Sequence, residues 1–211
     1  MLQTCSVKKR TQLYIDLVLN MSSLIGIDAG HGESNRKCGV YDPGAVFEDE
    51  EFGLIYREAD ITFFYSQLLG SILEENGYKV FQTRPSIDSH VPLSTRVSSA
   101  EDAGCDLLIS IHTNAFSIPT ASGCEVLYRD HEKDSSLAST LLAGVINSGL
   151  RIRSRGLKKR DNLSLLKFSK PVALLELGFI TNEDDRKKLF NLTMSRKICD
   201  SLVAHIKMFE F

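Results

Sequence analysis

Short apolar runs alternate along the chain with segments whose apolar residues recur every three to four positions. The first kind of segment is typical of buried strands and the second of amphipathic helices. Strands are predicted at Ser23–Ala29, Tyr78–Thr83, Asp106–His112, Cys124–Tyr128 and Pro171–Leu177. Helices are predicted at Glu58–Asn76, Leu93–Ala103, Ser135–Leu150, Glu183–Phe190 and Met194–Met208. Asn182 and Thr193 are expected to act as the N-caps of the last two helices, because their side chains can accept a bond from a free backbone N–H.

Strands that are apolar throughout, each followed by a helix, indicate a mostly parallel sheet covered on both faces. We therefore predict an α/β fold with a mostly parallel, twisted sheet and helices on both faces, in a single domain over residues 23–211. The segment Cys38–Glu51 is rich in Gly, Pro and acidic residues and is predicted to be a loop. Residues 1–22 are predicted to be an N-terminal appendage. Their basic run and short apolar stretch resemble a signal peptide, but Asp16 interrupts the stretch and no small-residue cleavage site follows.

The amino-acid composition excludes several classes of protein. The chain has 211 residues, of which 43% are hydrophobic and 25% charged, so it is neither disordered nor a multi-span membrane protein. A net charge of -2 gives no argument for nucleic acid as a partner. The five cysteines are odd in number and form no CxxC pair, which argues against a disulfide framework or a thiolate zinc site.

Three ionisable residues fall where parallel sheets place functional groups, beyond the carboxyl ends of the strands, and a fourth opens a helix. His31 follows the first predicted strand, His112 ends the third, Glu176 lies late in the last, and Glu58 opens the first long helix. Two imidazoles and one carboxylate are a recognised ligand set for catalytic zinc, with a fourth position open to water. A further carboxylate could then act as general base.

Each of these residues also has a plain structural interpretation. A histidine such as His31 in a loop is usually a polar surface group, and Glu58 alone would pass as an acid at a helix start. His112 is harder to dismiss, because an unpaired polar ring in an apolar run costs free energy. Glu176, between Leu175 and Leu177, must be paired, protonated or functional. Their joint occurrence favours a site.

Several motifs, in order and at regular spacing over roughly residues 24–208, resemble the zinc-dependent N-acetylmuramoyl-L-alanine amidases with an amidase-3 catalytic domain. The matching blocks are Asp28-Ala29-Gly30-His31-Gly32, Asp42-Pro43-Gly44-Ala45, Glu58–Tyr78, Val80–Arg84 (VFQTR), Arg96, Asp106–Ala115 (DLLISIHTNA), Ser154-Arg155-Gly156-Leu157 and Glu176–Asn182 (ELGFITN). Two departures are small: Cys105 stands where alanine is usual, and Cys38 lies in the loop after the first histidine, where a thiolate could reach the metal.

The resemblance implies a role for each matched residue. His31, Glu58 and His112 would be the ligands of one Zn²⁺ ion, and Glu176 the catalytic acid and base. Residues that would bind substrate are Asn114, Arg96 and Arg155. The implied reaction is hydrolysis of the amide between the lactyl group of N-acetylmuramic acid and L-alanine in peptidoglycan.

The setting implied by the resemblance is the cell wall, with peptidoglycan as the partner, no nucleic acid, no membrane span and a monomeric chain. A compact catalytic domain resembles a phage endolysin that is made in the host cytoplasm and released at lysis. A secreted bacterial autolysin is the alternative. Two other functions stay open: a zinc peptidase that cuts within the stem peptide, and a non-catalytic wall-binding module. The basic cluster Arg151–Arg160 is interpreted as a solvated loop, with attraction to an anionic wall as the alternative.

The appendage generates a first prediction. A chain that begins at Met21 should unfold cooperatively and cleave peptidoglycan as the full chain does, because residues 1–20 are expected to add nothing to the core. Thermal unfolding and a wall-digestion assay measure the two properties. Loss of cooperative unfolding would show that the appendage packs on the domain.

Overall fold

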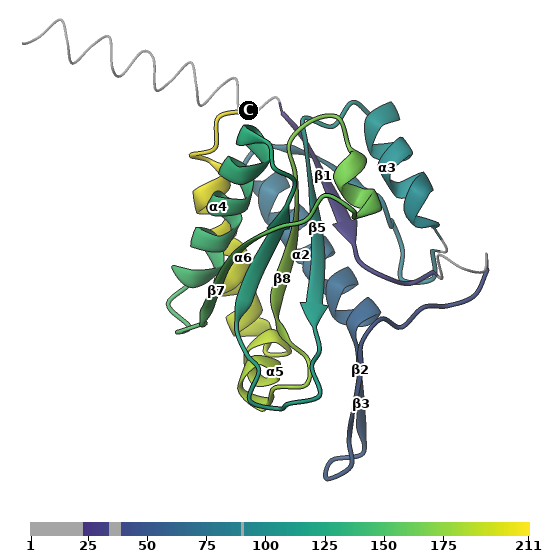
Figure 1. Ribbon diagram of the computed structural model, residues 1–211, viewed down its shortest axis with the longest axis vertical. Coiled ribbons are helices and arrows are strands. Elements are labelled where there is room, and N and C mark those ends of the chain that lie inside the picture. The colour runs from purple at the N-terminus through teal and green to yellow at the C-terminus, as the bar shows by residue number, and fades with distance from the viewer. Residues whose placement is uncertain (1–22, 34–38, 90) are drawn as a thin grey trace, which may run out of the picture.

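The computed structural model describes residues 23–33, 39–89 and 91–211. The predicted appendage and Cys38 lie outside the described residues, so the expectations for them stay predictions. The described residues form one α/β unit in which a central sheet is packed between helices (Figure 1).

The central sheet has six strands and is mostly parallel, as predicted. β6 runs antiparallel to β8, and every other neighbouring pair is parallel. In spatial order the strands are β4 (Lys79–Gln82), β1 (Leu24–Ala29), β5 (Leu107–Asn114), β8 (Val172–Phe179), β6 (Cys124–Tyr128) and β7 (Ser154–Lys159). The middle strands β1, β5 and β8 are the most apolar, because both of their faces are covered.

Helices cover both faces of the sheet, which confirms the predicted fold class (Figure 1). The larger core lies on one face, where apolar side chains such as Tyr65 and Leu69 of α2 meet Ile25 and Ile27 of β1. The helices packed there are α2 (Glu58–Glu75), α4 (Glu132–Ile146) and α6 (Leu192–Ile206). On the other face a smaller core joins α3 (Leu93–Asp102) and the short 3-10 helix η1 (Ser164–Lys167) to the sheet. The remaining helix, α5 (Glu183–Leu189), follows β8.

Two predicted loops are strands, and those expectations were wrong. Part of the segment Cys38–Glu51 forms a hairpin with the residues after it, made of β2 (Val46–Asp49) and β3 (Leu54–Arg57), which projects from the body (Figure 1). The basic segment around Gly156 is the edge strand β7. Both were missed because exposed strands have no need of continuous apolar residues, and charged residues are common on sheet edges.

The starts of α2, α3 and α5 are as predicted, and the other helix boundaries differ from the prediction by one to four residues. α4 begins at Glu132, three residues earlier than predicted, because the buried Asp134 pairs with Arg129 of the preceding segment. It ends at Ile146, before Gly149, whose φ of 79° requires the left-handed backbone. Asn182 caps α5 as predicted, with its Oδ1 accepting a bond from the Asp185 N–H.

The predicted cap of the last helix was wrong. Asn191, and not Thr193, precedes α6, and its Oδ1 accepts a hydrogen bond of 3.0 Å from the Met194 N–H. Asn191→Ala should therefore lower the free energy of unfolding by about 1 kcal/mol, whereas Thr193→Ala should change it by less than about 0.5 kcal/mol. Urea denaturation of both variants measures this, and equal losses would contradict the assignment of the cap.

Candidate metal centre

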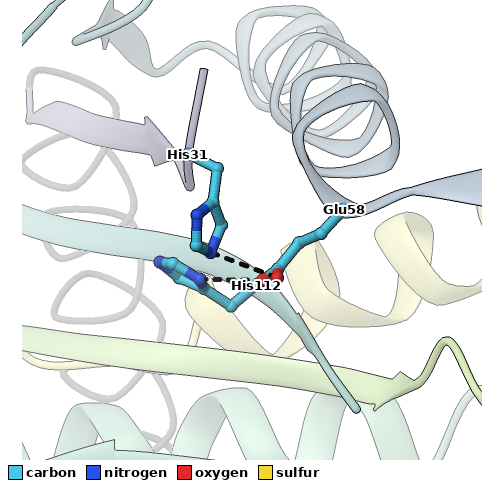
Figure 2. A group of neighbouring side chains, drawn as sticks. All are labelled: His31, Glu58 and His112. Atoms are coloured by element: carbon cyan, nitrogen blue, oxygen red, sulfur yellow. Dashed lines mark hydrogen bonds and ion pairs between the residues drawn. The ribbon is translucent and has the colours of Figure 1, made fainter. Parts of the chain in front are cut away.

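Three side chains that are far apart in the sequence meet at the carboxyl edge of the sheet (Figure 2). His31 lies in the loop after β1, Glu58 is the first residue of α2, and His112 lies in β5. One ligand atom from each falls within 4.8 Å of the others. Glu58 bridges the pair, with Oε2 at 3.1 Å from His31 Nε2 and Oε1 at 3.0 Å from His112 Nδ1.

Backbone pairing places these three residues. β1 and β5 are neighbours in the sheet, with Ala29 paired to Ile111, so His31 just after β1 lies close to His112, the next residue of β5. The start of α2 is fixed by two backbone bonds, from Glu58 N to Ala45 O at 2.8 Å and from Ala59 N to Pro43 O at 3.0 Å. The loop Asp42–Ala45 therefore brings Glu58 to the two histidines.

Two glycines leave room for the imidazoles. A Cβ on Gly30 would lie 2.5–2.7 Å from ring atoms of His112. A Cβ on Gly44 would lie 2.7 Å from Glu58 Oε2 and from the His31 ring, and the φ of Gly44 is 66°. Any larger residue at either position would displace a candidate ligand, which explains on steric grounds why glycine occurs there.

His31 is held by its other ring nitrogen. Asp42 Oδ2 lies 2.9 Å from His31 Nδ1, which leaves Nε2 to face Glu58. Burial alone would lower the pKa of His31, but the hydrogen bonds and charges of Glu58 and Asp42 outweigh it and raise that pKa to about 9. In zinc sites a carboxylate on the far side of a ligating imidazole fixes its tautomer and orientation.

Glu58 is buried, and four groups stabilise its charge. Burial would raise its pKa, yet the two imidazoles hold that pKa far below the usual range. The backbone N–H groups of Ala45 and Thr113 also donate to its carboxylate, at 2.9 and 3.0 Å. The carboxylate is thus ionised, as a metal ligand must be.

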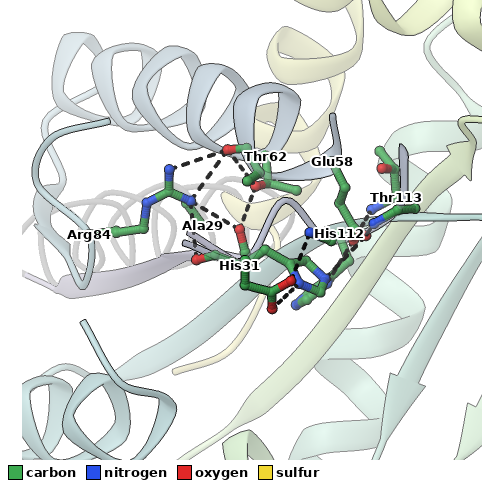
Figure 3. Close-up of polar contacts among 12 residues, drawn as sticks. Ala29, His31, Glu58, Thr62, Arg84, His112 and Thr113 are labelled. Carbon is green, nitrogen blue, oxygen red and sulfur yellow. Dashed lines mark hydrogen bonds and ion pairs between the residues drawn. The ribbon is translucent and has the colours of Figure 1, made fainter. Parts of the chain in front are cut away.

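Two buried arginines hold the backbone of His31 in a strained conformation. The φ of His31 is 62°, which costs on the order of 1–3 kcal/mol for a residue other than glycine. Its carbonyl accepts bonds from both Arg84 and Arg96. Arg84 also donates to Gly30 O at 3.0 Å and to Ala59 O at 3.3 Å, so it joins the His31 loop to the first turn of α2 (Figure 3).

Glu176 lies in the strand next to His112 and is its register partner. Its neighbours Leu175 and Leu177 are buried in the larger core, so its side chain points to the opposite face, as its strand context predicts. The Oε2 atom is buried and has no hydrogen-bond partner within the described part of the chain. Burial raises the pKa of Glu176 to about 7, with the negative charges of Glu58 and Glu125 adding to the effect and the histidines opposing it.

The three residues predicted to bind substrate have different surroundings. Arg96 is only 3% exposed and donates to Asp28, Ala29, His31 and Val91, which favours a positioning role over contact with substrate. Asn114 and Arg155 are partly exposed and both donate to Glu125, at 3.2 and 2.9 Å.

Sequence reasoning assigned no role to three residues that the structure places around the candidate ligands. Asp42 orients His31, Arg84 joins the two ligand-bearing segments, and Glu125 pairs with Glu176 across the sheet. Asp42 and Arg84 both lie within motifs that match the family, and that match was the sequence signal for them. Cys105, the departure from the usual alanine, is a buried free thiol under α3 and lies in the smaller core.

The donor set fits zinc. Two imidazoles and one carboxylate, with ligand atoms within 4.8 Å of each other, match the composition of catalytic zinc sites. The carboxylate oxygen of Glu176 without a partner faces the same edge.

Comparison with known proteins gives the class. A family model described as N-acetylmuramoyl-L-alanine amidase matches residues 25–208, so the chain belongs to this family of amidases. It is 36% identical to the protein YqiI of Bacillus subtilis, over 85% of this chain and 81% of that protein. The probable cell wall amidase LytH of Staphylococcus aureus is 33% identical over 84% of this chain, which spans 56% of the length of LytH.

Solved structures agree with the family. The N-acetylmuramoyl-L-alanine amidase AmiC2 of Nostoc punctiforme superposes with a TM-score of 0.75 and 28% identity, over 87% of this chain and 94% of that chain. No helix within the described residues is long and apolar enough to cross a membrane.

Removing one candidate ligand gives a direct test of the site. His112→Ala should lose most of the bound zinc and the activity together, because two remaining ligands cannot complete a zinc site. His131, a histidine whose side chain is 63% exposed, provides the matched control, and His131→Ala should keep its zinc. Elemental analysis of both purified variants gives the metal content, and full occupancy in His112→Ala would refute the assignment.

The raised pKa of His31 predicts how zinc binding depends on pH. Below a pKa of about 9 the His31 ring is protonated in the metal-free protein, and zinc must displace that proton. Zinc affinity should therefore rise by about tenfold per pH unit from pH 7 to 9 and level off above. Competition with a chelator of known affinity measures the slope, and an affinity that is flat over this range would contradict the protonated state.

Proposed function

We propose that the chain uses one Zn²⁺ ion, held by His31, Glu58 and His112, to hydrolyse the amide between the lactyl group of N-acetylmuramic acid and L-alanine in peptidoglycan. The observation that carries the proposal is the cluster of these three side chains beside the buried oxygen of Glu176. Membership of the amidase family supports it.

Each residue of the site has a separate role in the proposed hydrolysis. A bound zinc ion supplies a Lewis acid and lowers the pKa of water toward neutrality. Asp42 keeps Nε2 of His31 directed at the site. Glu176 accepts a proton from the attacking water at a carboxylate oxygen and returns it to the leaving nitrogen of L-alanine. Burial raises the pKa of Glu176 to about 7 in the metal-free protein, which makes this carboxylate a stronger base than an exposed glutamate.

The place of action follows from the substrate: the chain acts on the cell wall. Our finer proposal is an endolysin-like role, in which the chain stays in the host cytoplasm until lysis. Expression in the host with cell fractionation tests this role. The chain should lyse cells only after the membrane has been permeabilised from outside, whereas accumulation in the medium of intact cells would favour a secreted autolysin.

Two other functions predict different products. A zinc peptidase would cut within the stem peptide, and a wall-binding module would cut nothing. Mass spectrometry of digested peptidoglycan separates the three. The amidase releases peptides with a free N-terminal L-alanine and leaves the glycan intact, whereas cleavage inside the peptide would overturn the proposal in favour of the peptidase.

A substitution at Glu176 distinguishes a catalytic role from a metal-binding role. Glu176→Gln keeps the shape of the side chain and removes the base, so the variant should keep its fold and zinc while turnover falls by about 10²–10⁴-fold. The exposed Glu74 of α2 offers the same substitution as a control, and Glu74→Gln should have normal turnover.

Rate and zinc content are measured on the same purified sample of each variant. Near-normal turnover in Glu176→Gln would make Glu176 structural. Loss of zinc would make it a ligand, and one of the three proposed ligands would then be wrong.

A further inference from the structure

Arg155 lies at a β-bulge in strand β7, and the bulge sets the direction of its side chain. In the pairing of β6 with β7, Cys124 is opposite Ser154 but Glu125 is opposite Gly156, so Arg155 is an extra residue in β7. Gly156 has a φ of 81°, which allows the bulge to form. Bulges of this kind re-aim side chains and are frequent beside active sites.

The guanidinium of Arg155 is fixed at one end and free at the other. Its Nε donates to Glu125 Oε2 at 2.9 Å, and its Cζ lies 4.8 Å from the centre of the Phe179 ring. Neither terminal nitrogen donates to another residue within ranges 23–33, 39–89 and 91–211, and the side chain is 32% exposed. A held arginine with two free N–H-bearing nitrogens is suited to a planar anion.

A row of paired residues joins Arg155 to the proposed catalytic centre. His112 on β5 pairs with Glu176 on β8, and Glu176 pairs with Glu125 on β6. Neighbouring strands lie about 4.8 Å apart, so Glu125 is roughly 10 Å from His112 along the sheet. An extended peptide advances about 3.3 Å per residue, so that length corresponds to about two or three residues.

We propose that the free edge of the Arg155 guanidinium binds a carboxylate of the stem peptide, two or three residues beyond the bond that is cut. Glu125 and Phe179 hold the guanidinium in place, and Glu125 compensates its charge when no substrate is bound. The proposal rests on the proposed function, and it adds the substrate group that the site selects. The stem peptide offers such a group when its second residue is D-glutamate with a free α-carboxylate, and loses it when that carboxylate is amidated.

The test compares two soluble muropeptides that differ only in this group, one with D-glutamate and one with D-isoglutamine as the second residue. Arg155→Gln should lower kcat/KM for the carboxylate form by roughly 10–100-fold, mainly through KM, because one charged hydrogen-bonded pair is lost. Cleavage of the amidated form should change by less than about threefold, since that form has no carboxylate to pair with the Arg155 guanidinium. Arg155→Lys should recover part of the preference, as a point charge without the planar fork.

Arg153, an exposed residue just before β7, provides the matched control. Arg153→Gln removes the same charge from the same edge and should leave the ratio between the two substrates unchanged. Equal losses for both substrates in Arg155→Gln would overturn the proposal and make Arg155 a structural partner of Glu125.

Binding measured without turnover separates this inference from the reaction itself. Calorimetry with Glu176→Gln should show tighter binding of the carboxylate form, and the double variant Glu176→Gln/Arg155→Gln should lose that difference. If the preference in binding is present but the L-alanine amide is not cut by the wild-type chain, the proposed function fails and the Arg155 site stands. If cleavage occurs and neither measurement shows a preference, the Arg155 site fails and the proposed function stands.

Discussion

The buried carboxylate of Glu58 between two imidazoles is the interaction on which the site depends. An ionised carboxylate in a buried position is costly unless it is paired, and here His31, His112 and two backbone N–H groups offset that cost. These partners come from the β1 loop, the loop before β2 and β5, so the bridge closes only when those segments and the start of α2 are all in place. The same side chains are those that would hold the proposed zinc ion.

The surrounding residues keep this arrangement from relaxing. His31 has a left-handed backbone, and the bonds from Arg84 and Arg96 to its carbonyl offset the strain. Arg96 in turn pairs with the buried Asp28, whose carboxylate also accepts bonds from Ser110 and Thr83 at 2.6 and 2.5 Å. The effect is to tie the strand ends beneath the site into one hydrogen-bonded layer. A displacement of the first histidine would therefore break several buried bonds at once.

The sequence predicted those parts of the fold in which one physical signal dominates. Continuous apolar runs located the buried strands β1, β5 and β8 to within two residues, because both of their faces are covered. The hairpin β2–β3 was missed because it packs on the body through contacts such as Arg186 over the Phe47 ring at 3.6 Å, which no local pattern displays. The edge strand β7 was missed because it is charged and has no continuous apolar run. The Asn191 cap was missed because the helix begins at Leu192, an exposed residue outside the buried apolar stripe, two residues before the predicted start.

The same limit applies to the candidate site. Ionisable residues at the ends of apolar strands predicted that His31, His112 and Glu176 would gather, and the structure brings them to one edge. The roles of Asp42 and Arg84 were not visible, because an aspartate in a Gly-Pro loop and an arginine after a strand are usually exposed. Both roles depend on tertiary contacts between segments more than ten residues apart.

The central claim is that two imidazoles and one carboxylate hold a zinc ion. X-ray absorption at the zinc edge of the full chain, loaded with one equivalent of zinc, tests it most directly. We expect a first shell of nitrogen and oxygen at about 2.0–2.1 Å with the outer-shell scattering of two imidazole rings. A sulfur neighbour at about 2.3 Å, which Cys38 or another thiolate would supply, or the scattering of only one imidazole, would contradict it.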